Sequence, residues 1–265
     1  MNKVFQFSRF VKLVNWELAT DRPYNRKNLL VWIGSFCFIS IFLFVIKQPD
    51  DARLGALAFF SAIVTCVVVG GSYMFLSFRD RKDGIRELLL VPASNVEKFL
   101  SRYLVSFIVT LLSLTVAVIA ADGLQYALNV VAGHDDVSSV IANIIRLCGR
   151  TMQNAGPLLC HLLLLAIWAH TFFLFGANLF RSVKYSWVFT TLIIVAIIAL
   201  LVCVWSFGSS DAYENGYSFG QMVHNFLLNN AAVMYVVLPL LSVFNVALSY
   251  LLFCRRQLIG RFTNI

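Results

Sequence analysis

Six long runs of apolar residues recur along the chain, separated by short polar segments. A helix needs roughly 20 residues to cross the hydrocarbon core of a bilayer, and each run reaches about that length. Backbone amides cannot stay unsatisfied in hydrocarbon, so a helix is the expected form of each run. The pattern predicts an all-α, polytopic membrane protein with six transmembrane helices. The runs are Leu29–Ile46, Leu54–Phe78, Tyr103–Ala121, Pro157–Phe180, Trp187–Phe207 and Ala231–Cys254, and none holds an Asp, Glu, Lys or Arg.

Composition supports the membrane class. Hydrophobic residues make up 60% of the chain and charged residues 13%, and the mean hydropathy is +0.80. These values lie beyond those of an ordinary soluble chain. Little sequence remains for a soluble domain, so we expect one transmembrane domain over residues 1–265. It would consist of a leader over residues 1–28, a six-span bundle over 29–254 and a tail over 255–265.

The basic residues indicate the orientation. They concentrate in the leader, between the second and third runs, and after the fourth and sixth runs; the others are Lys47, Arg53, Arg146 and Arg150. Lys and Arg in short flanking loops stay on the cytoplasmic side, so both termini should be cytoplasmic. The net charge of +8 is then a topology signal and a preference for anionic lipid. Nucleic acid is not an expected partner.

The leader is predicted to be an amphipathic helix lying along the cytoplasmic headgroups. Pro23 should end it, because proline lacks an amide proton and restricts the residue before it. The chain would then turn at residues 25–27 into the bilayer. The helix is either a basic anchor that only fixes topology or one that also contacts a partner. Its apolar face is formed by Phe7, Phe10, Val11, Val14 and Leu18.

The segment between the second and third runs is predicted to form two short helices. Residues 84–90 form the first, Pro92 interrupts it, and Ser94 with Glu97 is a capping box that opens the second, which continues into the third span. An apolar run, residues 88–91, lies among many charges here. Buried apolar surface with charges at its rim suits a docking element for a partner. In the alternative interpretation, the leucines insert into the headgroups.

The segments expected on the outer side allow more than one form. Residues 122–156 should lie outside, and the stretch 123–132 could extend the third span, re-enter the membrane or cover the bundle. A second amphipathic helix is predicted there. Its apolar face is formed by Val137, Val140, Ile141, Ile144 and Cys148.

Few residues suggest chemistry. Asp122 is expected to be a solvated boundary residue. His161 and His170 are nine positions apart, on opposite helix faces and about 13 Å from each other, so they cannot share a metal, and interhelical hydrogen bonds are their expected role. Two patches of small residues should let helices approach closely, namely Gly70, Gly71 and Ser72 in the second run, and Gly176 with Ala177 in the fourth.

No catalytic, cofactor-binding or metal site is expected. The six cysteines show no disulfide or zinc spacing, and no phosphate-binding loop G-x-x-x-x-G-K-[ST] occurs. The chain therefore has no evident site of its own that could supply energy, such as an ATP-binding site, and we expect it not to be an enzyme.

These features together resemble the permease subunits of ABC-2 type ATP-binding-cassette exporters. The topology agrees along the whole chain. Residue-level similarity is confined to residues 89–102, LLVPASNVEKFLSR, which look like a segment recurrent in bacterial permeases of this kind, particularly those of Bacteroidetes. A large outer segment between spans three and four departs from the better-known eukaryotic members, which have theirs between spans five and six.

The resemblance implies a permease of the bacterial inner membrane that acts as a dimer, with a second copy or a paralogue. It implies a separate cytoplasmic ATPase that carries the ATP and touches both the leader helix and the loop between spans two and three. The coupling element would then be Arg86, Glu87, Leu88, Leu89, Leu90, Pro92, Ser94, Glu97 and Lys98.

Two other classes stay open. A membrane scaffold or assembly factor would need the same helices and docking loop. A membrane-embedded enzyme would need converging polar groups, such as His161 with Asn178 or Asp122. Apolar spans suit lipid, drug-like or peptide cargo equally.

Overall fold

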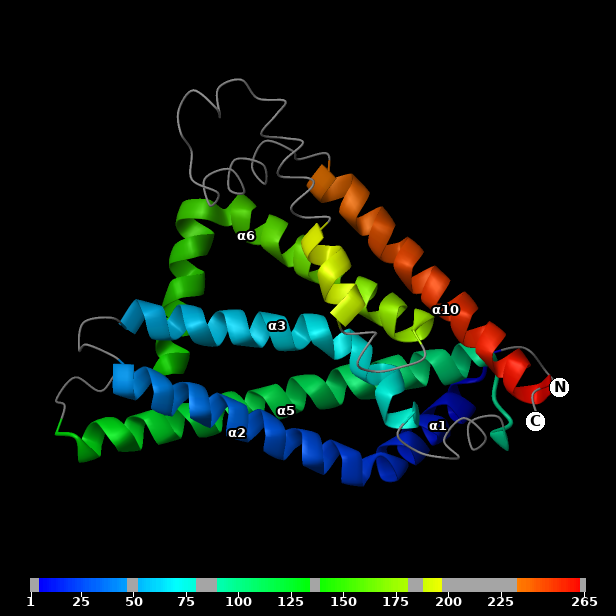
Figure 1. Ribbon diagram of the computed structural model, residues 1–265, viewed down its shortest axis with the longest axis horizontal. Helices are drawn as coiled ribbons and strands as arrows, with labels where there is room; N and C mark the ends of the chain where they lie inside the picture. The colour runs from blue at the N-terminus through cyan, green and yellow to red at the C-terminus, as the bar shows by residue number, and fades with distance from the viewer. Residues whose placement is uncertain are drawn as a thin grey trace, which may run out of the picture. The chain divides into compact units, whose positions relative to one another are not determined.

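The computed structural model describes residues 5–46, 52–79, 90–133, 139–180, 188–196 and 233–262. Within these ranges every regular element is a helix and there is no strand (Figure 1). The predicted all-α class is therefore confirmed. Residues 188–196 are also helical. The named elements are α1 (Phe7–Thr20), α2 (Arg22–Ile46), α3 (Ala52–Arg79), α5 (Asn95–Val131), α6 (Val140–Leu179), the π-helical η1 (Val233–Val237) and α10 (Leu238–Phe262).

Four helices in the described ranges are long and apolar enough to cross a membrane. They are Arg22–Val45, Asn95–Val131, Cys160–Leu179 and Tyr235–Arg255, and they fall on the first, third, fourth and sixth predicted runs. The membrane character of the chain is thus supported by length and composition. The second run forms α3, whose searched apolar part, Ala58–Gly71, is shorter. The fifth run is described only over residues 188–196, so a count of six spans stays a prediction.

The chain divides into two compact units, Met1–Thr151 and Met152–Ile265. In the first unit α5 packs against α1, α2 and α3, and Figure 1 shows α2, α3 and α5 running side by side. Small residues on α5 permit close approach: Ala117 and Ala121 are fully buried, and the Ser40 hydroxyl of α2 donates to the Ala121 carbonyl at 3.1 Å. The apolar core here is formed by Phe36, Phe59, Leu114, Ala117, Ala121 and Val140.

The turn between the leader and the first span lies earlier than expected. Helix α1 ends at Thr20 with Asp21 as its C-cap, and α2 starts at Arg22. Pro23 therefore sits in the first turn of α2, where its missing amide proton costs nothing. The expectation that residues 25–27 form the turn is wrong, because they are already helical.

On the other side of the first unit, α5 continues to Val131, so the stretch 123–132 extends the third predicted span. Asp122 is not simply solvated: its carboxylate accepts from the Val140 amide at 2.6 Å and from the Ser139 hydroxyl at 2.8 Å. Asp122 thereby provides a hydrogen-bond acceptor for a backbone amide at the start of α6. Val140 is buried as its predicted apolar face requires, whereas Val137 lies outside the described residues.

Both predicted small-residue contacts occur. A Cβ built on Gly70 of α3 would lie 3.3 Å from Thr110 Cγ2 of α5. In the second unit, a Cβ on Gly176 of α6 would overlap the hydroxyl of Thr190, which is itself buried. Helices therefore approach closely at both glycines, as small residues allow in membranes.

Candidate functional site

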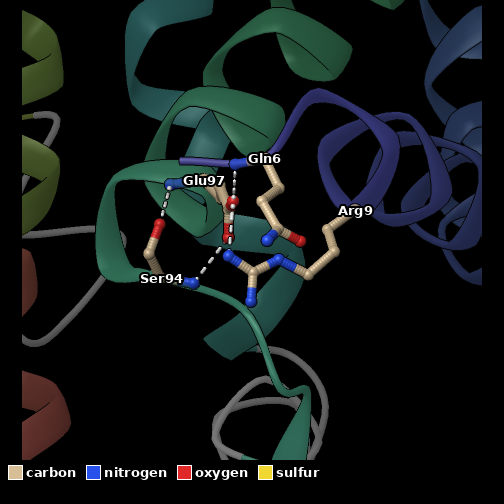
Figure 2. A network of polar contacts seen from close by, with 4 residues as sticks. All are labelled: Gln6, Arg9, Ser94 and Glu97. Atoms are coloured by element: carbon tan, nitrogen blue, oxygen red, sulfur yellow. Dashed lines mark hydrogen bonds and ion pairs between the residues drawn. The ribbon is translucent and has the colours of Figure 1, made fainter. Parts of the chain in front are cut away.

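The capping box predicted at the start of α5 is present. The Glu97 amide donates to Ser94 Oγ at 3.2 Å, and the Ser94 amide donates to Glu97 Oε2 at 2.6 Å (Figure 2). Two of the amides that a helix start leaves without partners are thereby satisfied. The box fixes where α5 begins and how the chain enters it.

The second oxygen of the same carboxylate reaches the leader. Glu97 Oε1 accepts from the Gln6 amide at 2.6 Å and lies 3.3 Å from Arg9 Nη2, as Figure 2 shows. Gln6 is the N-cap of α1, and Glu97 accepts from its backbone amide, which is one of the amides that a helix start leaves without an intrahelical partner. A negative charge is favourable at a helix N-terminus, and here one fully buried carboxylate serves two helices.

Two further polar contacts join α1 to α5. Ser101 Oγ donates to Glu17 Oε1 at 3.1 Å, and Arg102 Nη1 binds Asp21 Oδ2 at 2.7 Å. The Arg102 and Asp21 side chains are only 4% and 9% exposed. Together with the Glu97 contacts, they fasten the leader helix at both ends and along its length. We call this set the leader clamp: Gln6, Arg9, Glu17 and Asp21 on the leader, and Glu97, Ser101 and Arg102 on α5.

Burial controls the electrostatics of the clamp. Loss of water raises the pKa of Glu17 to about 7, against the opposing effects of the Arg102 charge and the Ser101 hydrogen bond. Its second oxygen, Oε2, has no hydrogen-bond partner among the described residues. A carboxyl group with this pKa is partly protonated near neutral pH, and it lies near the charges of Arg102 and Asp21.

The apolar stripe predicted on the leader divides between two environments. Phe10 is buried, together with Leu13, against the rest of the unit. Val14 is half-buried, whereas Phe7 is 71% exposed and Val11 and Leu18 are also exposed. The exposed residues still suit a membrane surface.

Sequence reasoning missed the inner polar face of the leader. A signal existed, because Glu17 and Asp21 are the only acidic residues in a basic leader and lie one helical turn apart.

The predicted coupling residues fall into three groups. Arg86, Glu87, Leu88 and Leu89 lie outside the described residues. Leu90 is 83% exposed and Pro92 is exposed, so both can be touched from outside. Ser94, Glu97 and Lys98 face inward or cap the helix, and Glu97 and Lys98 are buried. Glu97 and Lys98 lie inside the protein, and the coupling role assigned to them stays a prediction.

The groups considered for enzyme chemistry make the following contacts. In the second unit, Asn178 of α6 donates to the Leu174 carbonyl and to the Ser249 hydroxyl of α10. His161 is buried with its ring 5.0 Å from that of Tyr235, and within the described ranges neither of its nitrogens has a hydrogen bond. A ring contact thus replaces the hydrogen bond expected for it. Asp122 caps α6, as described above. The described part of the chain holds no group of three potential metal ligands.

Comparisons with protein-family models, with curated proteins and with solved structures gave no match for this chain.

Proposed function

We propose that this chain is the membrane-spanning permease subunit of an ABC-2 type ATP-binding-cassette exporter. It would lie in a bacterial inner membrane with both termini in the cytoplasm. It would act as a dimer, with a copy of itself or a paralogue, and a separate ATPase would hydrolyse the ATP. The chain itself supplies geometry and no bond-breaking chemistry.

The observation that carries the proposal is the leader clamp. A motor that pushes on the segment before α5 needs a stiff connection to the spans, because a flexible joint would absorb the movement. The capping box starts α5 directly after Pro92, and Glu97 fastens that start to the leader. Since α5 is one helix from Asn95 to Val131, a force applied beside Leu90 reaches the full length of the third span.

The exposed position of Leu90 supports the same proposal. A large apolar side chain with 83% of its surface open, next to the proline joint, suits a partner's pocket better than water. The buried clamp behind it keeps this end of the segment in place. A scaffold protein could use the same surface, and it would require no response to nucleotide.

The test is co-purification of the tagged full-length chain from its native membrane, with the partners identified by mass spectrometry. We expect a chain with a phosphate-binding loop to co-purify, to be reduced at least tenfold by Leu90→Asp and to be unchanged by Thr115→Ala. Thr115 is the control because it lies exposed on α5 and bonds only its own helix, at the Leu111 carbonyl. Equal recovery with Leu90→Asp, or no ATPase at all, would refute the proposal.

A further inference from the structure

The junction between the leader and the first span carries a group of unpaired cations. Helix α1 leads directly into α2 (Figure 1), and Arg22, Arg26 and Lys27 lie exposed at the start of α2. None of the three side chains makes an ion pair or a hydrogen bond within the part of the chain that the structure describes. We call this group the basic corner.

The acidic residues of the leader do not neutralise the basic corner. Glu17 and Asp21 are buried, and their carboxylates bind side chains of α5. The clamp thus holds these two carboxylates inside the unit and leaves the cations of the corner without a counter-charge. Arg22 and Arg26 are also four residues apart on one helix, and like charges at this spacing repel each other and destabilise the helix. The corner therefore favours an anion from outside the chain.

An uncovered apolar face of α2 begins directly beside the basic corner. Leu30, Val31 and Gly34 follow Lys27 by three, four and seven residues, so the four share one face of the helix. Leu30 and Val31 are exposed, as is Phe38 one turn further on, and a Cβ built on Gly34 would meet no atom within 4 Å. An anion that carries apolar chains therefore fits this place better than a free anion does.

The leader presents a second apolar surface on the other side of the corner. Phe7, Val11 and Leu18 are exposed along α1. A helix of this kind lies in the headgroup region of a bilayer with its apolar side toward the acyl chains. The basic corner is then at the depth of the lipid phosphates, between two surfaces that contact acyl chains.

We propose that the basic corner binds the phosphate group of an anionic phospholipid, whose acyl chains lie along the exposed face of α2. Arg26 donates charge-assisted hydrogen bonds to the phosphate, Lys27 binds it as a point charge, and Arg22 adds to the positive field. The bound lipid relieves the repulsion among the three cations. It thereby holds the junction of α1 and α2 from outside, as the clamp holds it from inside. The site needs no partner protein and does not rest on the proposed function.

The first test is native mass spectrometry of the full-length protein in a neutral detergent, titrated with phosphatidylglycerol as the anionic probe and phosphatidylethanolamine as the zwitterionic one. The site variant carries Arg26→Gln with Lys27→Gln, and the matched control carries Arg146→Gln with Arg150→Gln. Arg146 and Arg150 are exposed cations of α6 in the same unit, so both variants lose the same charge.

Each cation beside an anionic lipid surface is worth about fivefold in binding. The site variant should therefore bind phosphatidylglycerol at least ~10-fold more weakly than the wild type, and the control should stay within about twofold. Phosphatidylethanolamine should bind the wild type at least ~5-fold more weakly than phosphatidylglycerol does. Glycerol phosphate, which has the phosphate but no acyl chains, should not displace phosphatidylglycerol at equal concentration.

A second measurement locates the lipid and keeps the native cations, so it does not depend on the folding of a charge variant. A photoreactive side chain replaces Leu30 or, as the control, Leu112 of α5, in vesicles with equal amounts of the two lipids. The two leucines are comparably open, at 69% and 62% exposed. Adducts at position 30 should contain phosphatidylglycerol in at least ~5-fold excess, and adducts at position 112 should follow the bulk ratio.

Five results would overturn the proposal. In the titration they are equal binding of phosphatidylglycerol by the site variant and the wild type, equal weakening in the control, and displacement of the lipid by glycerol phosphate at equal concentration. In the vesicles they are the bulk lipid ratio at position 30 and adducts there with a second copy of the chain, which would show that protein covers this face.

Discussion

Removing one partner of the Asp21–Arg102 ion pair should release the leader helix. The pair is short, at 2.7 Å, and its side chains are 4% and 9% exposed. In Asp21→Asn, the guanidinium loses its counter-charge while it stays buried. Breaking a buried pair from one side costs about 3–5 kcal/mol, because an uncompensated charge remains. That loss corresponds to a roughly 10²- to 5 × 10³-fold increase in the population of a locally opened leader.

The assay is limited trypsin digestion, with cleavage after Lys12 quantified by mass spectrometry. Lys12 is exposed but lies inside α1, so cleavage there requires local unfolding. We expect Asp21→Asn to speed this cleavage at least ~100-fold. Arg22→Gln is the matched control, since Arg22 is exposed and adjacent to Asp21 in sequence. Its cleavage rate should stay within about twofold of the wild type.

The double variant Asp21→Leu with Arg102→Met tests whether the loss of stability comes from an unpaired buried charge. Replacing a whole buried pair by apolar groups is often neutral or stabilising, so most of the protection at Lys12 should return. If Asp21→Asn cleaves no faster than wild type, the pair does not hold the leader. If the double variant is as labile as Asp21→Asn, the cost does not come from an unpaired charge.

Three further predictions concern stability. The folded-state pKa of Glu17, about 7, exceeds its ordinary value of 4.5, so the folded state holds the proton more tightly. Stability should therefore fall by up to about 3 kcal/mol as pH rises from 4.5 to 7, and Glu17→Gln should remove this slope in detergent unfolding curves at a series of pH values. Gly176→Ala should destabilise the protein by about 1–3 kcal/mol through overlap with Thr190, and adding Thr190→Ala should restore most of the lost stability. Gly123→Ala is the control, because Gly123 has open space around it. Equal losses of Tm at both glycines would contradict the packing. Glu97→Ala should cost about 3 kcal/mol in unfolding free energy, and Glu97→Gln should cost less, because its one amide oxygen can still accept from one helix start although its NH2 group cannot accept from the other; equal losses would contradict this role.

Local patterns in the sequence predicted local structure well. The three-residue spacing of Ser94 and Glu97 predicted the capping box, and both of its hydrogen bonds are present. The apolar runs predicted the helices because run length and hydropathy are properties of a single segment and need no knowledge of its neighbours in space. The small-residue patches predicted the close contacts for the same reason, because a missing side chain leaves room for any neighbouring helix.

Long-range contacts could not be predicted in this way. Glu17 and Ser101 are 84 residues apart, and the sequence around neither residue indicates that the two side chains form a hydrogen bond. Asp122 was assigned to solvent because its acceptor role depends on where α6 begins.

The central claim, that an external ATPase drives this chain through the segment beside the leader clamp, is tested most directly by site-specific cross-linking. A photoreactive side chain replaces Leu90 in the full-length protein in native membranes, and adducts are identified by mass spectrometry with and without ATP. The account predicts an adduct with a chain that carries a phosphate-binding loop, in a yield that changes with nucleotide. Adducts with lipid alone, or with proteins that lack such a loop, would contradict it.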